Sequence, residues 1–250
     1  MKNELAWKAE QACLNAWPSL HNVVYDDWII RFSEGLTRRA NSVNPLRATA
    51  RADGASIQLF ENLFRAQDLP LIFRIPTLLD PSVDRALDRL GFTAEGESCV
   101  IYADIGALEA KPDPAVEVSP RVEEDWLNEM NRMQKRTEEQ SEIFDHIVLS
   151  IAVPAGYATF RDHGEVVAQA YGVIHDDLMC CESVITSETA RGKGVGRRLM
   201  SALYAWAAAQ GASGVCLQVE AGNKAGRALY DGLGMKTELS RYHYRRQPSR

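Results

Sequence analysis

The feature that most constrains the fold is a glycine-rich turn joining a strand to a helix, at Val184–Gly196. Val184, Ile185 and Thr186 are β-branched or aliphatic and precede polar turn residues, as at the end of a strand. After the turn, apolar residues recur at helical spacing until Gly211, which predicts a helix. The turn therefore fixes one strand end against one helix start.

The same turn has the composition of an anion-binding site. Glycines let a ligand approach the backbone closely, and the first N–H groups and the dipole of the following helix favour negative charge. The glycines are Gly192, Gly194 and Gly196, and the basic residues around them are Arg191, Lys193, Arg197 and Arg198. We expect a site for an anion of pyrophosphate size.

Two common nucleotide motifs do not fit this spacing. A Walker P-loop requires Ser or Thr directly after Lys193, and a dinucleotide fingerprint requires G-x-G-x-x-G rather than G-x-G-x-G. The pattern Arg191-x-x-Gly194-x-Gly196 instead resembles the acyl-CoA pyrophosphate loop of the GCN5-related N-acetyltransferases (GNATs). The segment 223–235 follows in the order of that family and resembles its N-x-x-A-x-x-L-Y-x-x-x-G-F motif. The alternative is a chance glycine turn in an ordinary α/β protein.

The resemblance implies an α/β (α+β) fold with two GNAT-like lobes, each a mixed, mostly antiparallel sheet flanked by helices. Residues 1–110 would form a degenerate lobe and residues 114–250 the catalytic domain, because Ala110–Pro114 has the composition of a linker. Both halves show the order strand, strand, helix, strand, helix, strand. The first half keeps only a trace of the loop at Arg51–Ser56 and has Leu87 at the tyrosine position. An unrelated α+β extension is the alternative.

Composition limits the function classes. The 250-residue chain is 46% hydrophobic and 25% charged, with a formal net charge of −6, which argues against a general nucleic-acid or membrane surface. No apolar run approaches the roughly 18 residues of a membrane span. Five cysteines without metal-ligand spacing are expected to be reduced core residues of a cytoplasmic protein that binds no metal.

One polar segment of the first half has two interpretations. Trp28–Phe32 has the pattern of a strand, and Leu36–Val43 is expected to be its hairpin partner. Arg38, Arg39 and Asn41 lie in this partner. They would either belong to a solvated edge strand, where charge discourages pairing with other chains, or face the other lobe and help to bind an acceptor.

The family resemblance also implies how acetyl-CoA would be held. Backbone groups of Val184, Ile185 and Thr186 would bind the pantetheine arm as an extra strand and polarise the thioester carbonyl. Asn223 would contact the cofactor or its bound water, and Tyr230, the position of the family's general acid, would protonate the leaving thiolate. The pyrophosphate would be bound by Arg191, Gly192, Lys193, Gly194, Val195, Gly196 and Arg197. A core tyrosine is the alternative for Tyr230.

The general base is open between several residues. Glu182 lies amid apolar neighbours on the strand that enters the loop, which would raise its pKa, and a structural salt bridge is its alternative role. Glu220, at the end of the next strand, is the second candidate, followed by His175 or a water relay. Strand alternation predicts that Glu182 shares a face with Val184 and Thr186.

These expectations combine into one function. The chain would move an acetyl group from acetyl-CoA to the primary amine of a small molecule by direct attack in a ternary complex. Acetylation of a protein or peptide amine is the second enzymatic interpretation, and a non-catalytic acyl-CoA sensor is an interpretation of a different class. The sequence leaves a homodimer open.

Overall fold

Two long strands, one from each half of the chain, join the molecule into one sheet. The computed structural model describes residues 2–248, which form eleven strands in the order β1-β2-β3-β4-β11-β5-β10-β9-β8-β7-β6. The strands are β1 His21–Tyr25, β2 Trp28–Phe32, β3 Val43–Pro45, β4 Ile72–Pro76, β5 Thr93–Asp104, β6 Val116–Ser119, β7 Ala155–Asp162, β8 Glu165–His175, β9 Leu178–Thr186, β10 Gly214–Glu220 and β11 Thr237–Arg246.

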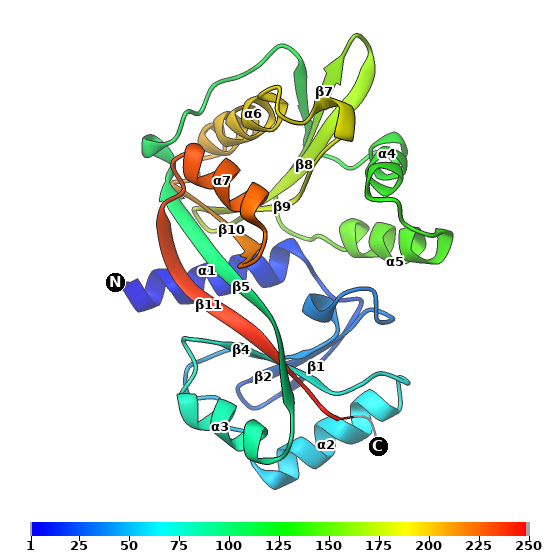
Figure 1. Cartoon of the computed structure of the whole chain (residues 1–250), viewed down its shortest axis with the longest axis vertical. Coiled ribbons are helices and arrows are strands. Elements are labelled where there is room, and N and C mark those ends of the chain that lie inside the picture. The colour runs from blue at the N-terminus through cyan, green and yellow to red at the C-terminus, as the bar shows by residue number, and fades with distance from the viewer. Residues whose placement is uncertain (1, 249–250) are drawn as a thin grey trace.

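Seven α-helices of the described chain flank this sheet, as Figure 1 shows. They are α1 Lys2–Ala16, α2 Gly54–Arg65, α3 Pro81–Arg89, α4 Glu124–Gln134, α5 Glu138–Leu149, α6 Val195–Ala209 and α7 Lys224–Gly232. Only the β3–β4 and β9–β10 pairs within residues 2–248 are parallel. The mixed, mostly antiparallel α/β fold expected from the sequence is confirmed.

The strands β5 and β11 cross between the two halves. Strand β5, from the first half, pairs along its Ser98–Asp104 segment with β10 of the second half. Strand β11, from the end of the chain, lies between β4 and β5 and pairs with both. Figure 1 shows β5 and β11 running together through the middle of the molecule. The expected boundary at residues 110–114 falls between β5 and β6, so each half contributes a strand to the other.

Helix α1 belongs by its packing to the sheet of the second half. It contacts β8 and β9 most extensively, and its buried face consists of small residues, which let a helix lie close to a sheet. These residues are Ala6, Ala9, Ala12, Cys13 and Ala16. Helices α4 and α5 share this core through Met130 and Phe144, whereas α6 covers a separate core with Leu199 and Leu203. A third core, around Trp28 and Phe73, lies in the first half.

The expected hairpin of Trp28–Phe32 with Leu36–Val43 is wrong. Strand β2 pairs with β1 and with the short β3, while Arg38–Ala40 forms a 3-10 turn. The Asn41 side chain explains the difference. Its Oδ1 accepts hydrogen bonds from the backbone N–H groups of Ser33 and Gly35, and its Nδ2 donates to the carbonyl of Thr37. Asn41 thus holds a folded loop in place of a strand.

None of the described helices combines the length and apolar character needed to cross a membrane.

The strand crossing predicts that the second half does not fold alone. A fragment of residues 114–250 lacks β5 and α1, which leaves β10 and β11 with unpaired edges and exposes the apolar face that α1 covers. We expect this fragment to show no cooperative thermal transition by circular dichroism, and co-expressed residues 1–113 to restore one. A transition of the fragment alone within a few degrees of the intact chain would contradict this dependence.

Candidate active site

The candidate active site lies where β9 and β10 separate. The two strands pair in parallel from Leu178–Cys181 and Gly214–Leu217, and no further pair joins them within residues 2–248. Beyond this point β9 still pairs with β8 and β10 still pairs with β5. The edge of residues 183–186 that faces β10 is therefore without a strand partner. Such an edge can accept an extended ligand as an added strand.

A β-bulge at Ser183 sets which side chains face which side of this opening. Ser183 has φ +52°, and Glu182 lies opposite Tyr171 while Ile185 lies opposite Gln169, so β9 has one extra residue here. The bulge breaks strand alternation. The expectation that Glu182 shares a face with Val184 and Thr186 is therefore wrong.

The two faces are occupied differently. Glu182 contacts Arg39 on the face covered by α1, whereas Val184 packs into the core under α6. Thr186 lies beside Gly196, since a Cβ added to that glycine would be 3.5 Å from the Thr186 Oγ1. The bulge therefore directs the Glu182 carboxylate to one side of the opening and the side chains of Val184 and Thr186 to the side of the turn.

The glycine-rich turn has the geometry that its sequence predicts. Gly192 and Gly194 have φ values of +74° and +78°, a region that favours glycine. A Cβ added at either residue would meet no atom within 4 Å, so the surface of the turn is open. Gly194 is the N-cap of α6 and provides no side-chain cap, which leaves the first N–H groups of the helix available to an anion.

The basic residues of the turn divide into two groups. Arg191 and Lys193 are exposed, and Arg191 Nε donates to the Thr186 carbonyl at 3.2 Å. Arg197 is also exposed and donates to the Gly232 carbonyl at 2.9 Å. Arg198 instead forms a bidentate ion pair with Asp113, at 2.6 and 2.8 Å, and its hydrogen-bonded charge lowers the pKa of Asp113. Arg198 is thus committed to a structural pair rather than to the anion site.

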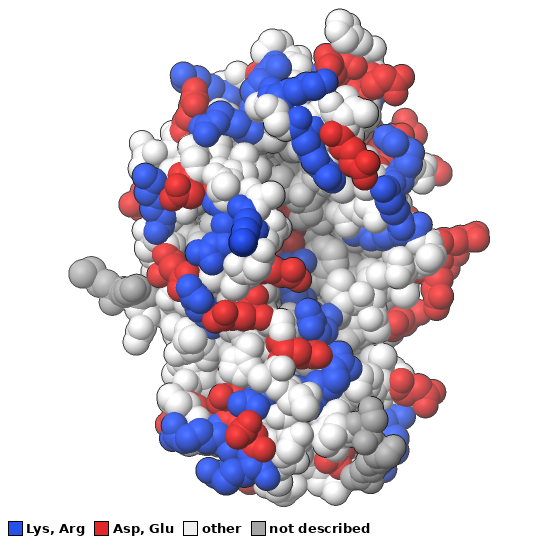
Figure 2. All heavy atoms as spheres, viewed as in Figure 1, with Lys and Arg blue, Asp and Glu red and all other residues white. Residues whose placement is uncertain are grey.

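A cavity of about 530 Å³ adjoins the opening on the α1 side. It lies between the loop around residues 35–39 and the strands β5, β10 and β11, so both halves of the chain form its walls. Its charged and aromatic lining consists of Arg38, Arg39, Glu220, Tyr242, Tyr244 and Arg246. Figure 2 shows a hollow in the middle of the molecule, with acidic and basic side chains along it.

Glu182 and Arg39 form a buried ion pair across the two halves. Arg39 Nη1 lies 2.6 Å from Glu182 Oε1, and the Glu182 side chain is 5% exposed. The same guanidinium stacks over Trp17, 4.7 Å from the ring centroid. Burial raises the pKa of Glu182, and Arg39 counteracts part of that rise. The structure therefore shows a salt bridge at Glu182, which is one of the two roles that the sequence leaves open for this residue. It also shows that Arg39 faces the other half of the chain and does not belong to a solvated edge strand.

The other carboxylate, Glu220, differs from Glu182 in its surroundings. It is exposed, lies at the end of β10 and lines the cavity. None of the ion pairs within residues 2–248 involves it. His175, the further candidate, lies opposite Leu178 at the other end of β9 and contacts Asn15, so the structure does not bring it to the opening.

Tyr230 lies on α7, and Asn223 is the N-cap residue directly before this helix. Burial raises the pKa of the Tyr230 phenol well above its usual value, and Cys181 and Glu182 add to the rise. Tyr230 also packs against the core under α6, which Cys181 and Val184 of β9 join on the turn side of the opening. The Asn223 side chain caps α7 by accepting a hydrogen bond from the Gly226 N–H at 2.9 Å.

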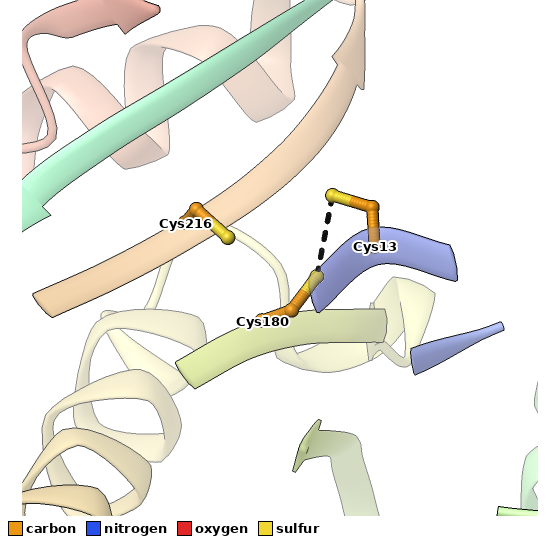
Figure 3. Close-up of side chains that lie close together, drawn as sticks. All are labelled: Cys13, Cys180 and Cys216. Carbon is orange, nitrogen blue, oxygen red and sulfur yellow. Dashed lines mark hydrogen bonds between the residues drawn. The ribbon is translucent and has the colours of Figure 1, made fainter. Parts of the chain in front are cut away.

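Three thiols converge in a way that no sequence spacing reveals. Cys13, Cys180 and Cys216 come from α1, β9 and β10, and their sulfur atoms lie within 4.8 Å of one another (Figure 3). The Sγ atoms of Cys13 and Cys180 are 3.6 Å apart. All three are buried and free, so they act as small packing residues that hold α1 against the two separating strands.

The buried pair predicts a pH-dependent stability defect. Removing Arg39 leaves the Glu182 carboxylate buried without a partner, and we expect Arg39→Ala to lower the free energy of unfolding by about 3–5 kcal/mol at neutral pH. The pKa of Glu182 is higher in the folded state than in the unfolded state, so the unfolded state loses its proton first as pH rises. The contribution of Glu182 to stability therefore falls as pH rises above about 4.3, the usual pKa of a glutamate in an unfolded chain. The defect, measured by urea unfolding, should be larger at pH 7.5 than at pH 5.

Matched variants isolate the charge. Arg39→Ala combined with Glu182→Gln should regain part of the loss and show no such pH dependence, whereas Arg89→Ala, at an exposed position of α3, should change little. If Arg39→Ala lowered the free energy of unfolding equally at pH 5 and pH 7.5, whether residue 182 is Glu or Gln, then Arg39 would not be neutralising a buried Glu182 carboxylate.

Comparisons with known proteins show the family and the fold of the chain. A sequence model of the family described as "Probable histone acetyltransferase Rv0428c C-terminal" matches residues 7–246. The chain is 24% identical over 243 residues to the uncharacterized N-acetyltransferase YobR of Bacillus subtilis (strain 168), covering 95% of this chain and 97% of the relative.

Solved structures share the fold. A GCN5-related N-acetyltransferase from Kribbella flavida matches with a TM-score of 0.73 at 17% identity, over 100% of this chain and 96% of that one. A tandem GNAT protein from the clavulanic acid biosynthesis pathway matches with a TM-score of 0.64 at 12% identity, over 84% and 76% of the two chains. The chain therefore belongs to the Rv0428c C-terminal acetyltransferase family, within the GCN5-related N-acetyltransferases.

Proposed function

We propose that this acetyltransferase moves an acetyl group from acetyl-CoA to the primary amine of a small molecule, by direct attack in a ternary complex. The observation that carries the proposal is the separation of β9 from β10, with an open anion-binding turn on one side and a charged cavity on the other. A thioester bound along the opening would have its carbonyl between the turn and the cavity. The five free, buried thiols suit the reducing cytoplasm, where we place the protein.

The residues at the opening suit the parts of acetyl-CoA. The unpaired edge of Val184, Ile185 and Thr186 would hydrogen-bond the pantetheine arm. The first N–H groups of α6, from Val195 to Arg197, would hold the pyrophosphate, with Arg191 and Lys193 contributing charge. Gly192 and Gly194 leave the backbone accessible to the phosphates, because no side chain shields the turn.

We assign proton transfer to Glu220 and Tyr230. Glu220 is exposed in the cavity and without an ion-pair partner there, so it can accept the proton of the attacking ammonium, whereas Glu182 is neutralised by Arg39. The raised pKa of Tyr230 keeps its phenol protonated through neutral pH, which is the form that can protonate a leaving thiolate. Glu182 then fixes Arg39 and with it the cavity wall.

A protein acceptor is the second candidate function. The description of the matching family names a histone acetyltransferase, and the net charge of −6 suits a basic partner. The cavity volume of about 530 Å³, with walls from both halves of the chain, favours the small molecule.

Gly194→Asp tests the cofactor site. Aspartate tolerates the left-handed backbone of this position, but its carboxylate would meet the pyrophosphate, so acetyl-CoA affinity measured by calorimetry should fall by roughly 100-fold or more. Gly194→Asn is the matched control, since it has the same size and backbone tolerance without the charge, and it should lose far less affinity. If both variants bound acetyl-CoA as the native chain does, the turn would not hold the pyrophosphate.

Two substitutions test the proton transfers. Tyr230→Phe and Glu220→Gln should each lower kcat by about 100-fold, because each removes a group acting in the transition state, and should leave the Kd for acetyl-CoA unchanged. The control is Tyr204→Phe, whose buried hydroxyl faces the Met235 sulfur in the α6 core. Steady-state CoA release and calorimetry separate the two effects. Native turnover in either variant would remove that residue from the mechanism.

A further inference from the structure

The cavity beside the opening has a wall with surplus positive charge. Arg38 and Arg246 share one carboxylate, Glu95, whose Oε1 lies 3.5 Å from Arg38 Nη1 and 2.9 Å from Arg246 Nη2. The hydrogen bond from Arg246 is the main cause of a lowered pKa at Glu95, which is therefore ionised at neutral pH. Two guanidinium groups against one carboxylate leave one positive charge without a partner at this end.

Arg38 is held in position for a ligand. Its guanidinium lies over the Tyr244 ring, 4.9 Å from the centroid, and packs against Gly96 of β5. A Cβ at Gly96 would be 2.8 Å from Arg38 Nη2, so the glycine makes room for this side chain. Its side chain remains 36% exposed, which leaves N–H donors facing the cavity.

The opposite wall has an unpaired negative charge. Glu220 lines the same cavity and forms none of the ion pairs found within residues 2–248. Glu182 and Arg39, also at this end, neutralise each other. The cavity therefore presents a carboxylate at the end near the opening and a guanidinium at the other end.

The register of β5 gives the separation of the two charges. Glu220 lies opposite Ser98, and Arg38 packs at Gly96 beside Glu95. At about 3.3 Å per residue, two to three residues of strand separate the two levels by roughly 7–10 Å at the backbone. The side chains of Glu220 and Arg38 both line the cavity. A ligand that contacts both residues must therefore carry its two charged groups several bonds apart.

We propose that the acceptor is a primary amine carrying a carboxylate several bonds away, with the amine at Glu220 and the carboxylate on Arg38. A carboxylate matches the fork of a guanidinium, and its single charge balances the one surplus positive charge of this wall. This inference rests on the proposed function, because it names the substrate class of the same site.

The test compares acceptors that differ only in the carboxylate. With acetyl-CoA, 5-aminovalerate should give a kcat/KM roughly 10- to 100-fold above that of n-pentylamine, as expected for a lost charged hydrogen bond. Arg38→Ala and the longer Arg38→Gln should each remove that preference and leave n-pentylamine almost unaffected. Arg89→Ala, at an exposed position of α3, is the control for removing an arginine outside the cavity. Matched thermal unfolding would show that the variants are folded.

Calorimetry separates the inference from the proposed function. Binding of 5-aminovalerate to the CoA-loaded native protein, weakened about tenfold or more by Arg38→Gln, supports the carboxylate site even where no acetyl product forms. Equal use of 5-aminovalerate, n-pentylamine and a lysine peptide, with no effect of Arg38, overturns the inference and keeps the acetyltransferase function. If no amine bound and none caused CoA release, both the inference and the proposed function would be overturned.

Discussion

The pairing of β5 between β10 and β11 is the interaction on which the rest of the structure depends. It brings a strand of the first half against the second half, and the C-terminal strand against the first half. The cavity walls follow from this exchange, because the loop that carries Arg38 and Arg39 comes from one half and Glu220 from the other. The segment Arg51–Ser56 of the first half has one glycine, Gly54, where residues 191–196 have three. What the first half contributes instead is a wall and its charges.

Those charges extend beneath the cavity into the core. Arg39 pairs with Glu182, and Arg74 pairs with Glu10, both pairs being buried on their acidic side. Arg31 is also buried, but within residues 2–248 its side chain hydrogen-bonds only to neutral groups, the Ser19 hydroxyl and backbone carbonyls. Burial lowers the pKa of Arg31 to about 9, so it remains charged at neutral pH. The core under the cavity thus has one positive charge in excess, which favours an anionic group on the ligand above it.

The sequence predicts those parts of the site that depend on neighbouring residues. The turn at Val184–Gly196 forms as expected because positive φ values at Gly192 and Gly194 are a local preference of glycine. Local patterns could not show that 237–246 would insert between β4 and β5, since that pairing joins segments far apart in the chain. The loop at Leu36–Val43 was missed for a related reason. Its polar residues resemble an edge strand, but Asn41 satisfies the loop's own backbone.

The bulge at Ser183 shows why the face of a catalytic candidate escapes sequence reasoning. A serine with φ +52° adopts a conformation that costs about 1–3 kcal/mol and persists only where the surroundings enforce it. Here β8 holds the strand on both sides of the bulge, while β10 has already separated. One extra residue then sends Glu182 to the side of the cavity and Val184 to the side of the turn, so that a single strand presents side chains to both sides of the opening. The strained residue, Ser183, is the position at which the alternation of side chains between the two faces of β9 is interrupted.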